Sequence, residues 1–262
     1  MRDAASANTW AYAALSQILT AVLIGLSALA IGFVMPPIIA LWPWFAVTVI
    51  LNVATNIFQY EALRTAEISF FTILASSRVL VSMVAAWLVL NEHITLLQGF
   101  GSIVMLAAIV IAFSRHFKLQ YERWMTFTLL YALSSGFIFI ADARIVGASE
   151  SVVSYQFFAF LLPGLATIFI HPKTVVDVVR IACSKEIIRM TIYSALYGIM
   201  CVTLWLAYQH GALASQLAPI RQSAIILTLI IATLFLNERS HFGRKLIASL
   251  LAVLSVYLIS AA

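Results

Sequence analysis

Two arginines lie inside long apolar stretches of this sequence, where an unpaired charge is costly. Arg78 interrupts the stretch 67–90, and Arg221 interrupts the stretch 213–236. If the first stretch forms a helix, Arg78 lies about 18 Å from either end at a rise of 1.5 Å per residue, so its guanidinium needs a nearby anion. Two interpretations stay open for both arginines: they attract a carboxylate or phosphate of a bound solute, or they form internal ion pairs. The acidic residues considered for such pairs are Glu61, Glu67 and Asp142.

Uncharged polar residues recur at helical spacing in similar stretches. Asn52, Asn56 and Gln59 are spaced by four and then three positions, so they share one helix face. That face either lines a polar cavity or makes interhelical hydrogen bonds, which contribute roughly 0.6–2 kcal/mol each in membranes. Two further faces combine aromatic and polar residues, and packing explains such faces more simply. Their members are Tyr131, Ser135 and Asp142 on one helix and Tyr197, Cys201 and Tyr208 on another.

A carboxylate recurs after an apolar run in each half of the chain. Glu92 occurs in LVLNEHITLLQGFG and Glu238 in LFLNERSHFGRKLI, each directly after an asparagine. Such a carboxylate can cap the next helix and interact with its dipole, typically by about 0.3–1 kcal/mol, whereas the alternative role is proton coupling. Pro219 stands just before Arg221 and frees backbone carbonyls, which suits either a flexible gate or a static kink.

The amino-acid composition indicates that these residues lie in a membrane protein. Of 262 residues, 63% are hydrophobic and 10% are charged, and the mean hydropathy of +1.05 leaves too little polar surface for a soluble globule. Continuous apolar runs of about 20 residues predict membrane-spanning helices, whereas the strands of a barrel would alternate. We therefore predict an all-α integral membrane protein. The predicted transmembrane helices are 10–33, 41–63, 67–90, 94–114, 124–142, 151–170, 189–209, 213–236 and 243–261.

Other kinds of chemistry have little support in the sequence. The histidines are scattered without ligand spacing, and Cys183 and Cys201 imply no disulfide framework, so we expect neither a metal site nor a cofactor. No phosphate-binding loop, pair of catalytic carboxylates or HExxH pattern occurs, so we expect no catalytic residues and no enzyme. The net charge of +5 is spread over short loops, so no nucleic-acid partner is expected.

Lysine and arginine are distributed unequally between the two sides of this arrangement. Almost all of those in loops lie on one side, and the other side holds only Arg144. Because cytoplasmic loops retain basic residues, the pattern predicts a cytoplasmic N-terminus and a C-terminus on the opposite side. That side is the periplasm in a bacterial inner membrane, the location that we expect. On the cytoplasmic side, HPKTVVDVVRIACSKEIIR, starting at His171, forms either a short amphipathic helix on the inner leaflet or a solvated loop.

The two carboxylate segments also divide the chain into corresponding halves. Aligning Asn91-Glu92 with Asn237-Glu238 matches the helix before, the turn and the helix after. An odd number of helices separates the copies, so they face opposite sides of the membrane, as in an inverted repeat with a solute site near the midplane. We predict a first repeat of four helices over 1–115 and a second repeat of five helices over 116–262.

The end of each half resembles the EamA-like family of the drug/metabolite transporter (DMT) superfamily. The first matching segment is EALRTAEISFFTILASSRVLVSMVAAWLVLNEHITLLQGFG, which ends at Gly101. The second is HGALASQLAPIRQSAIILTLIIATLFLNER, after which Ile247 replaces the corresponding glycine. The resemblance implies ten helices and two cytoplasmic termini, so the family's first helix is missing from the predicted set. Either Met1 is a misplaced start within a longer reading frame, or the protein is a shortened member.

The resemblance implies a secondary transporter, an exporter of a small polar or amphipathic metabolite such as an amino acid, a nucleoside or a drug-like molecule, working by alternating access. Its partners would be the solute, membrane lipid and a proton as coupling ion. The alternatives are a flippase for lipid-linked sugars or drugs and a non-transporting partner subunit or truncated remnant. Candidate solute-binding residues are Arg78, Arg221, Asn52, Asn56, Gln59, Tyr131, Ser135 and Tyr208; candidate structural residues are Glu92, Glu238, Pro219 and Gly101.

Overall fold

The computed structural model describes residues 8–90, 93, 95–113, 122–213, 217, 224–235 and 242–260. These residues form helices and the turns between them, with no strand in the described ranges. The predicted all-α membrane fold is therefore confirmed. The chain divides into two compact units: the first unit contains residues 1–60 and 141–212, and the second unit contains residues 61–140 and 213–262.

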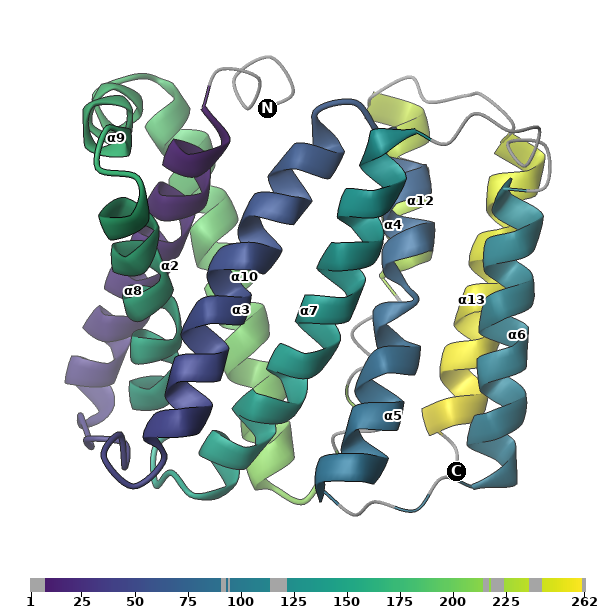
Figure 1. The fold of residues 1–262 in the computed structure, drawn as a ribbon, viewed down its shortest axis with the longest axis horizontal. Helices are drawn as coiled ribbons and strands as arrows, with labels where there is room; N and C mark the ends of the chain where they lie inside the picture. The colour runs from purple at the N-terminus through teal and green to yellow at the C-terminus, as the bar shows by residue number, and fades with distance from the viewer. Residues whose placement is uncertain are drawn as a thin grey trace. The chain divides into compact units, whose positions relative to one another are not determined.

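The first unit is centred on the packing of α2 against α8 (Figure 1). The end of α7 also belongs to this unit. Its helices are α2 (Thr9–Ile31), α3 (Trp42–Leu63), α8 (Val152–Ile170), α9 (Thr174–Ala182) and α10 (Glu186–Gln209).

The second unit is centred on α6 and α13, which lie side by side in Figure 1. Most of α7 belongs to this unit, and α4 and α5 follow each other as two parts of one apolar segment. Its helices are α4 (Ile68–Ala75), α5 (Arg78–Leu90), α6 (Leu96–Phe113), α7 (Arg123–Gly147), α12 (Ile225–Phe235) and α13 (Phe242–Ser260).

Each predicted helix range contains a helix, with two differences in the described residues. The helix predicted over 124–142 continues to Gly147, because the hydroxyl of Tyr155 binds the Asp142 carboxylate at 2.5 Å and Arg144 suits the negative end of the helix dipole. The range 67–90 is divided after Ala75. Six spans among the described residues are long and apolar enough to cross a membrane. They are Thr9–Ile31, Ile68–Leu90, Arg123–Gly147, Val152–Ile170, Glu186–Gln209 and Phe242–Ile259.

The first turn of α6 is capped by its own sequence. The side chain of Gln98 accepts a hydrogen bond from the backbone N–H of Thr95 at 3.0 Å, and the Thr95 hydroxyl accepts one from the N–H of Gln98 at 3.2 Å. This reciprocal arrangement is a capping box. Glu92, for which we predicted a capping role, lies outside the described residues, as does Glu238.

Two glycines allow α2 and α8 to pack closely in opposite directions. A Cβ atom on Gly25 would lie 2.8 Å from the Phe157 ring, and one on Gly164 would lie 2.9 Å from the Ile18 side chain. Gly25 and Gly164 lie in the later parts of their helices, and each faces an earlier part of the other helix. The two helices are therefore antiparallel, and small residues let their backbones approach.

Gly101 has the same function between α6 and α13. A Cβ atom there would lie 2.7 Å from Cγ1 of Ile259 and 3.0 Å from the carbonyl oxygen of Ser255. The Ser255 hydroxyl also donates a hydrogen bond to the Gly101 carbonyl at 2.6 Å. Because Gly101 lies near the start of α6 and Ile259 near the end of α13, these helices are antiparallel too. The contact supports the structural role predicted for Gly101.

Candidate functional site

The break between α4 and α5 lies in the middle of a membrane-spanning segment. Ser76 and Ser77 separate the two helices, and Ile68–Leu90 has the length and hydropathy of one span. The hydroxyls of Ser76 and Ser77 bind the backbone carbonyls of Thr72 and Leu74 at 2.9 and 2.8 Å. Serine hydroxyls that bind the preceding turn bend helices, which explains a break that contains neither glycine nor proline.

Tight turns replace regular helical hydrogen bonds at this α4–α5 break. The backbone N–H groups of Ser77, Val79 and Leu80 donate to carbonyls three residues earlier, at 3.0–3.1 Å. Such bonds are typical of a 3₁₀ turn, which often marks a hinge inside a helix. Arg78 is the first residue of α5 and therefore lies directly at the break.

The guanidinium of Arg78 contacts Tyr131 of α7. Its Nη1 donates a hydrogen bond to the Tyr131 hydroxyl at 3.0 Å, and the Tyr131 ring packs 5.3 Å from the ring of Phe71. Arg78 is half-buried, whereas Tyr131 is buried. The structure thus brings together two residues, 53 positions apart, that the sequence identified on separate helices.

Gly136 allows α7 to approach α5 at this point. A Cβ atom on Gly136 would lie 2.6 Å from the Val81 side chain and 3.1 Å from the carbonyl oxygen of Arg78. Ser135, its neighbour, is half-buried and donates to the carbonyl of Ala132 at 3.2 Å. Sequence reasoning missed Gly136, although a glycine inside a predicted membrane helix is a recognisable signal of close helix packing.

The three carboxylates considered as partners of Arg78 each have another described partner. Glu67 pairs with Lys245 at 2.5 Å. Glu61 pairs with Arg64 at 3.2 Å, and Asp142 accepts the Tyr155 hydroxyl.

Lys245 is a second cation with apolar surroundings in the second unit. Its side chain is fully buried, and its ammonium lies 4.5 Å from the centre of the Phe70 ring as well as beside Glu67. From the sequence, Lys245 is one of the basic residues expected on the cytoplasmic side of the membrane. A useful signal was its place on the small-residue face of α13, which also contains Ala248, Ser249 and Ala252.

The other predicted solute-binding residues that the structure describes belong to the first unit. Asn52, Asn56 and Gln59 are half-buried on α3, and the Asn56 amide donates to the backbone carbonyl of Asn52 at 2.7 Å. Tyr208 of α10 belongs to the first unit and packs edge to face against Trp205 at 5.6 Å. Arg221 and Pro219 lie outside the described residues.

The described residues contain no group of three or more histidine, cysteine, aspartate or glutamate side chains that could hold a metal ion. Cys183 is exposed and Cys201 is buried, and both are free thiols. The chemistry of the Arg78 cluster is therefore that of a cation, a phenol and an aromatic ring, which together suit recognition of an anion with an apolar part.

Comparisons with known proteins agree with this membrane fold. The family model of the EamA-like transporter family matches residues 3–114. Among solved structures, 22 chains match, and one of them, titled "Crystal structure of protein", superposes with a TM-score of 0.71 at 15% sequence identity. That match covers 98% of this chain and 90% of the other. A search among curated proteins finds no match. The predicted resemblance is thus confirmed: residues 3–114 match the model of the EamA-like transporter family, and the described residues form an all-α membrane fold of the EamA kind.

Proposed function

We propose that this protein is a secondary transporter of the bacterial inner membrane, which exports a small polar or amphipathic metabolite bearing a carboxylate or phosphate. Arg78 would bind the anionic group of the solute, and Tyr131 would hold the guanidinium in place. The observation that carries the proposal is the position of Arg78 at the α4–α5 break, inside a membrane-spanning segment. The match to the model of the EamA-like family supports the transporter class.

The electrostatics of the break favour an anion. A half-helix that begins inside the membrane directs its positive dipole end and its first backbone N–H groups toward the break. Arg78 adds a full positive charge at the same point of α5. Phe71 and the Tyr131 ring offer an apolar surface beside that charge, which suits an amphipathic metabolite better than an inorganic ion.

The packing of helices supports the proposed inverted repeat over 1–115 and 116–262. The helices α2 and α8 hold corresponding places in the two proposed repeats, and so do α6 and α13. Both pairs are antiparallel and in close contact around glycines. Corresponding helices of an inverted repeat run in opposite directions, so this arrangement is what alternating access between two such repeats requires.

The proposed cytoplasmic N-terminus and periplasmic C-terminus follow from the basic loops. The loop between α8 and α10 carries Lys173, Arg180 and Lys185, all exposed, whereas Arg144 lies at the opposite end of α7 from Arg123. Retention of basic residues in the cytoplasm supports this orientation.

Export can be tested by comparing metabolites released by cells that produce the intact chain, Arg78→Ala, Arg78→Lys or an empty vector. We expect full release of one or more anionic solutes with intact Arg78 and none with Arg78→Ala. Release should be partial with Arg78→Lys, because lysine keeps the positive charge but lacks the planar guanidinium with its paired N–H donors. Arg64→Ala is the matched control, since Arg64 is partly exposed at the end of α3 and pairs with Glu61. Membrane levels of all variants are matched by immunoblot.

Three results would decide between the functions considered. Release that depends on Arg78 but not on Arg64 supports the proposal. Release of a neutral solute that is unchanged in Arg78→Ala would overturn the role of Arg78 while keeping transport. Equal release from producing cells and empty cells would instead favour a non-transporting membrane partner.

A further inference from the structure

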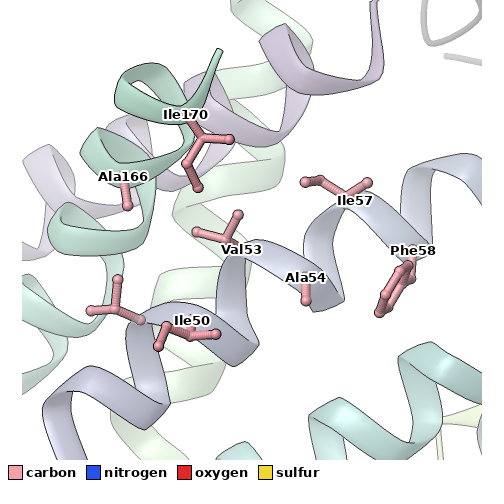
Figure 2. Close-up of a pocket in the computed structure, with 8 residues that line it drawn as sticks. Ile50, Val53, Ala54, Ile57, Phe58, Ala166 and Ile170 are labelled. Atoms are coloured by element: carbon pink, nitrogen blue, oxygen red, sulfur yellow. The ribbon is translucent and has the colours of Figure 1, made fainter.

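An apolar groove runs between α3 and α8 of the first unit (Figure 2). It has a volume of about 320 Å³, and we call it the α3–α8 groove. Its lining side chains are all aliphatic or aromatic: Val49, Ile50, Val53, Ala54, Ile57, Phe58, Ala166 and Ile170.

The groove is built for hydrocarbon rather than water. At about 30 Å³ per water molecule it has room for roughly ten, but a buried water needs two to four polar partners. The lining side chains contain carbon and hydrogen only, as Figure 2 shows for the labelled residues. An apolar chain can fill this space without leaving any polar group unpaired.

The groove lies toward one membrane face. Its α8 residues, Ala166 and Ile170, belong to the last five residues of that helix, and Ile170 is the last of all. The α3 residues extend from Val49 into the second half of that helix as far as Phe58. One end of the groove therefore opens where α8 leaves the membrane and the chain turns into α9.

The chain just beyond the groove is basic. His171 and Lys173 follow Ile170 directly and are exposed. The His171 ring stacks on Trp10 at 5.4 Å and its Nδ1 lies 2.9 Å from the Thr174 hydroxyl, so this turn has a fixed position on the first unit. Lys173 is exposed three residues beyond Ile170, the last lining residue of the groove, so its ammonium is accessible to an anion.

The next helix, α9, has the properties of a helix that lies on a membrane surface. Val175, Val176 and Val179 are 43%, 64% and 56% exposed, although they are apolar. The carboxylate of Asp177 is neutralised by Arg180 at 2.9 Å and accepts a hydrogen bond from Asn8. The helix therefore presents an apolar face and an excess of positive charge. This combination favours binding at the surface of a membrane that contains anionic lipid.

We infer that the α3–α8 groove is a binding site for an anionic phospholipid, with one acyl chain in the groove and the phosphate at Lys173. The occupant is a lipid rather than a soluble anion because the groove is purely apolar and its end meets a surface helix. The lipid would fix α3 against α8 in the leaflet that contacts α9. This site is separate from the cluster around Arg78, which belongs to the second unit.

The experiment is native mass spectrometry of the full chain after reconstitution into vesicles of equal parts phosphatidylglycerol and phosphatidylethanolamine. We expect the protein to retain phosphatidylglycerol in preference to phosphatidylethanolamine. Ala166→Phe fills the groove and should abolish retention of both lipids, whereas Leu165→Phe is the matched control because Leu165 is exposed and does not line the groove.

The headgroup contact has its own variant. Lys173→Gln should lower retained phosphatidylglycerol about fivefold, the factor that corresponds to roughly 1 kcal/mol for one lysine at an anionic surface. Retained phosphatidylethanolamine should fall less, because the ammonium of that lipid offsets the charge of its phosphate. Arg123→Gln removes an exposed charge from another helix and should have no effect.

Each remaining result would overturn a stated part of the inference. Unchanged retention in Ala166→Phe would show that the acyl chain does not occupy the groove. Equal retention of the two lipids, or a Lys173→Gln variant like the unmodified protein, would show that no anionic headgroup is recognised. Because Lys173 is exposed, its substitution leaves the fold intact and gives an answer even if Ala166→Phe fails to fold.

Discussion

Lys245 and Arg78 of the second unit are both cations in apolar surroundings, and the structure holds them very differently. Lys245 is fully buried, contacts the Glu67 carboxylate at 2.5 Å and lies over the Phe70 ring. Arg78 is half-buried at a helix break, and its Nη1 donates a hydrogen bond to the Tyr131 hydroxyl. In the first arrangement a fully buried ammonium contacts a partly exposed carboxylate at the start of α4. The second leaves part of a guanidinium accessible at an interruption of the backbone.

The two arrangements suit two different roles of a charged residue in a membrane protein: stabilising the packing of helices and binding a solute. A buried ion pair that is also packed against a ring holds helices together, and removing one partner leaves a charge that neither lipid nor water can solvate. A partly accessible arginine beside a hinge keeps its capacity to bind an incoming anion. We therefore expect substitutions at Lys245 to change stability and substitutions around Arg78 to change transport.

The largest effect should come from Lys245→Met. It leaves the Glu67 carboxylate without its buried partner, and we expect a loss of about 3 kcal/mol in the free energy of unfolding. This value is at the low end for a broken buried pair because the Glu67 side chain is 34% exposed. Denaturant titration in mixed micelles, followed by far-UV circular dichroism, measures it.

The double variant Lys245→Met/Glu67→Gln is the control for this prediction. Removing both charges should recover most of the lost stability, because an apolar or neutral pair of similar volume is often as stable as the ion pair. If Lys245→Met alone were as stable as the unmodified protein, Lys245 would not be a structural cation, and the contrast with Arg78 would fail.

A smaller effect is expected for Gly101→Ala, which tests how rigidly α6 packs against the far end of α13, the helix that carries Lys245. The new methyl group would meet Ile259 at 2.7 Å and the Ser255 carbonyl at 3.0 Å, so α6 and α13 must separate slightly. Overpacking of this kind costs about 1–3 kcal/mol, partly offset by the better helix propensity of alanine.

Gly99→Ala is the matched control, because a Cβ atom at Gly99 meets nothing within 4 Å. It lies two positions away on α6 and gains the same helix propensity without the clash. Thermal unfolding measures the difference. Relative to the unmodified protein, the midpoint temperature should be lower for Gly101→Ala and equal or higher for Gly99→Ala. Equal midpoints would show that α6 and α13 adjust freely.

Much of this architecture could be predicted from the sequence because membrane helices depend on local hydropathy. The apolar runs gave the ranges of α2, α3, α8 and α10 closely, and the amphipathic pattern after His171 predicted α9 as one of two alternatives. The face that contains Tyr131 was also recognisable from spacing. These features need only the period of a helix and the thickness of a bilayer.

Other features depend on contacts between distant segments and could not be predicted in this way. The partner of Arg78 is 53 positions away, and that of Lys245 is 178 positions from it, at Glu67. Hydropathy identified Lys245 as a loop charge because it cannot show which side of α13 is enclosed. The division of 67–90 at Ser76 and Ser77 was also missed, since serine can bend a helix or continue it depending on the hydrogen bonds that its hydroxyl makes.

The smallest effect on stability should come from Tyr131→Phe, which tests the Arg78 side of the comparison. The change removes only the hydroxyl that accepts from Arg78 and keeps the ring contact with Phe71. Polar contacts between membrane helices average about 0.6 kcal/mol, so the unfolding free energy should fall by no more than about 1 kcal/mol. Transport should fall further, because the guanidinium loses the group that orients it toward the solute.

Uptake into inverted vesicles separates these two consequences once an exported solute is identified. We expect Tyr131→Phe to raise the solute concentration for half-maximal uptake about tenfold, the factor equivalent to 1.4 kcal/mol, while the number of active transporters stays constant. Leu133→Ala, at an exposed position of α7 two residues from Tyr131, is the control for a substitution on the same helix that keeps the Arg78–Tyr131 contact. A variant that lost stability and kept full affinity would assign the Arg78–Tyr131 contact to packing, as for Lys245, and the two cations would then have the same structural role.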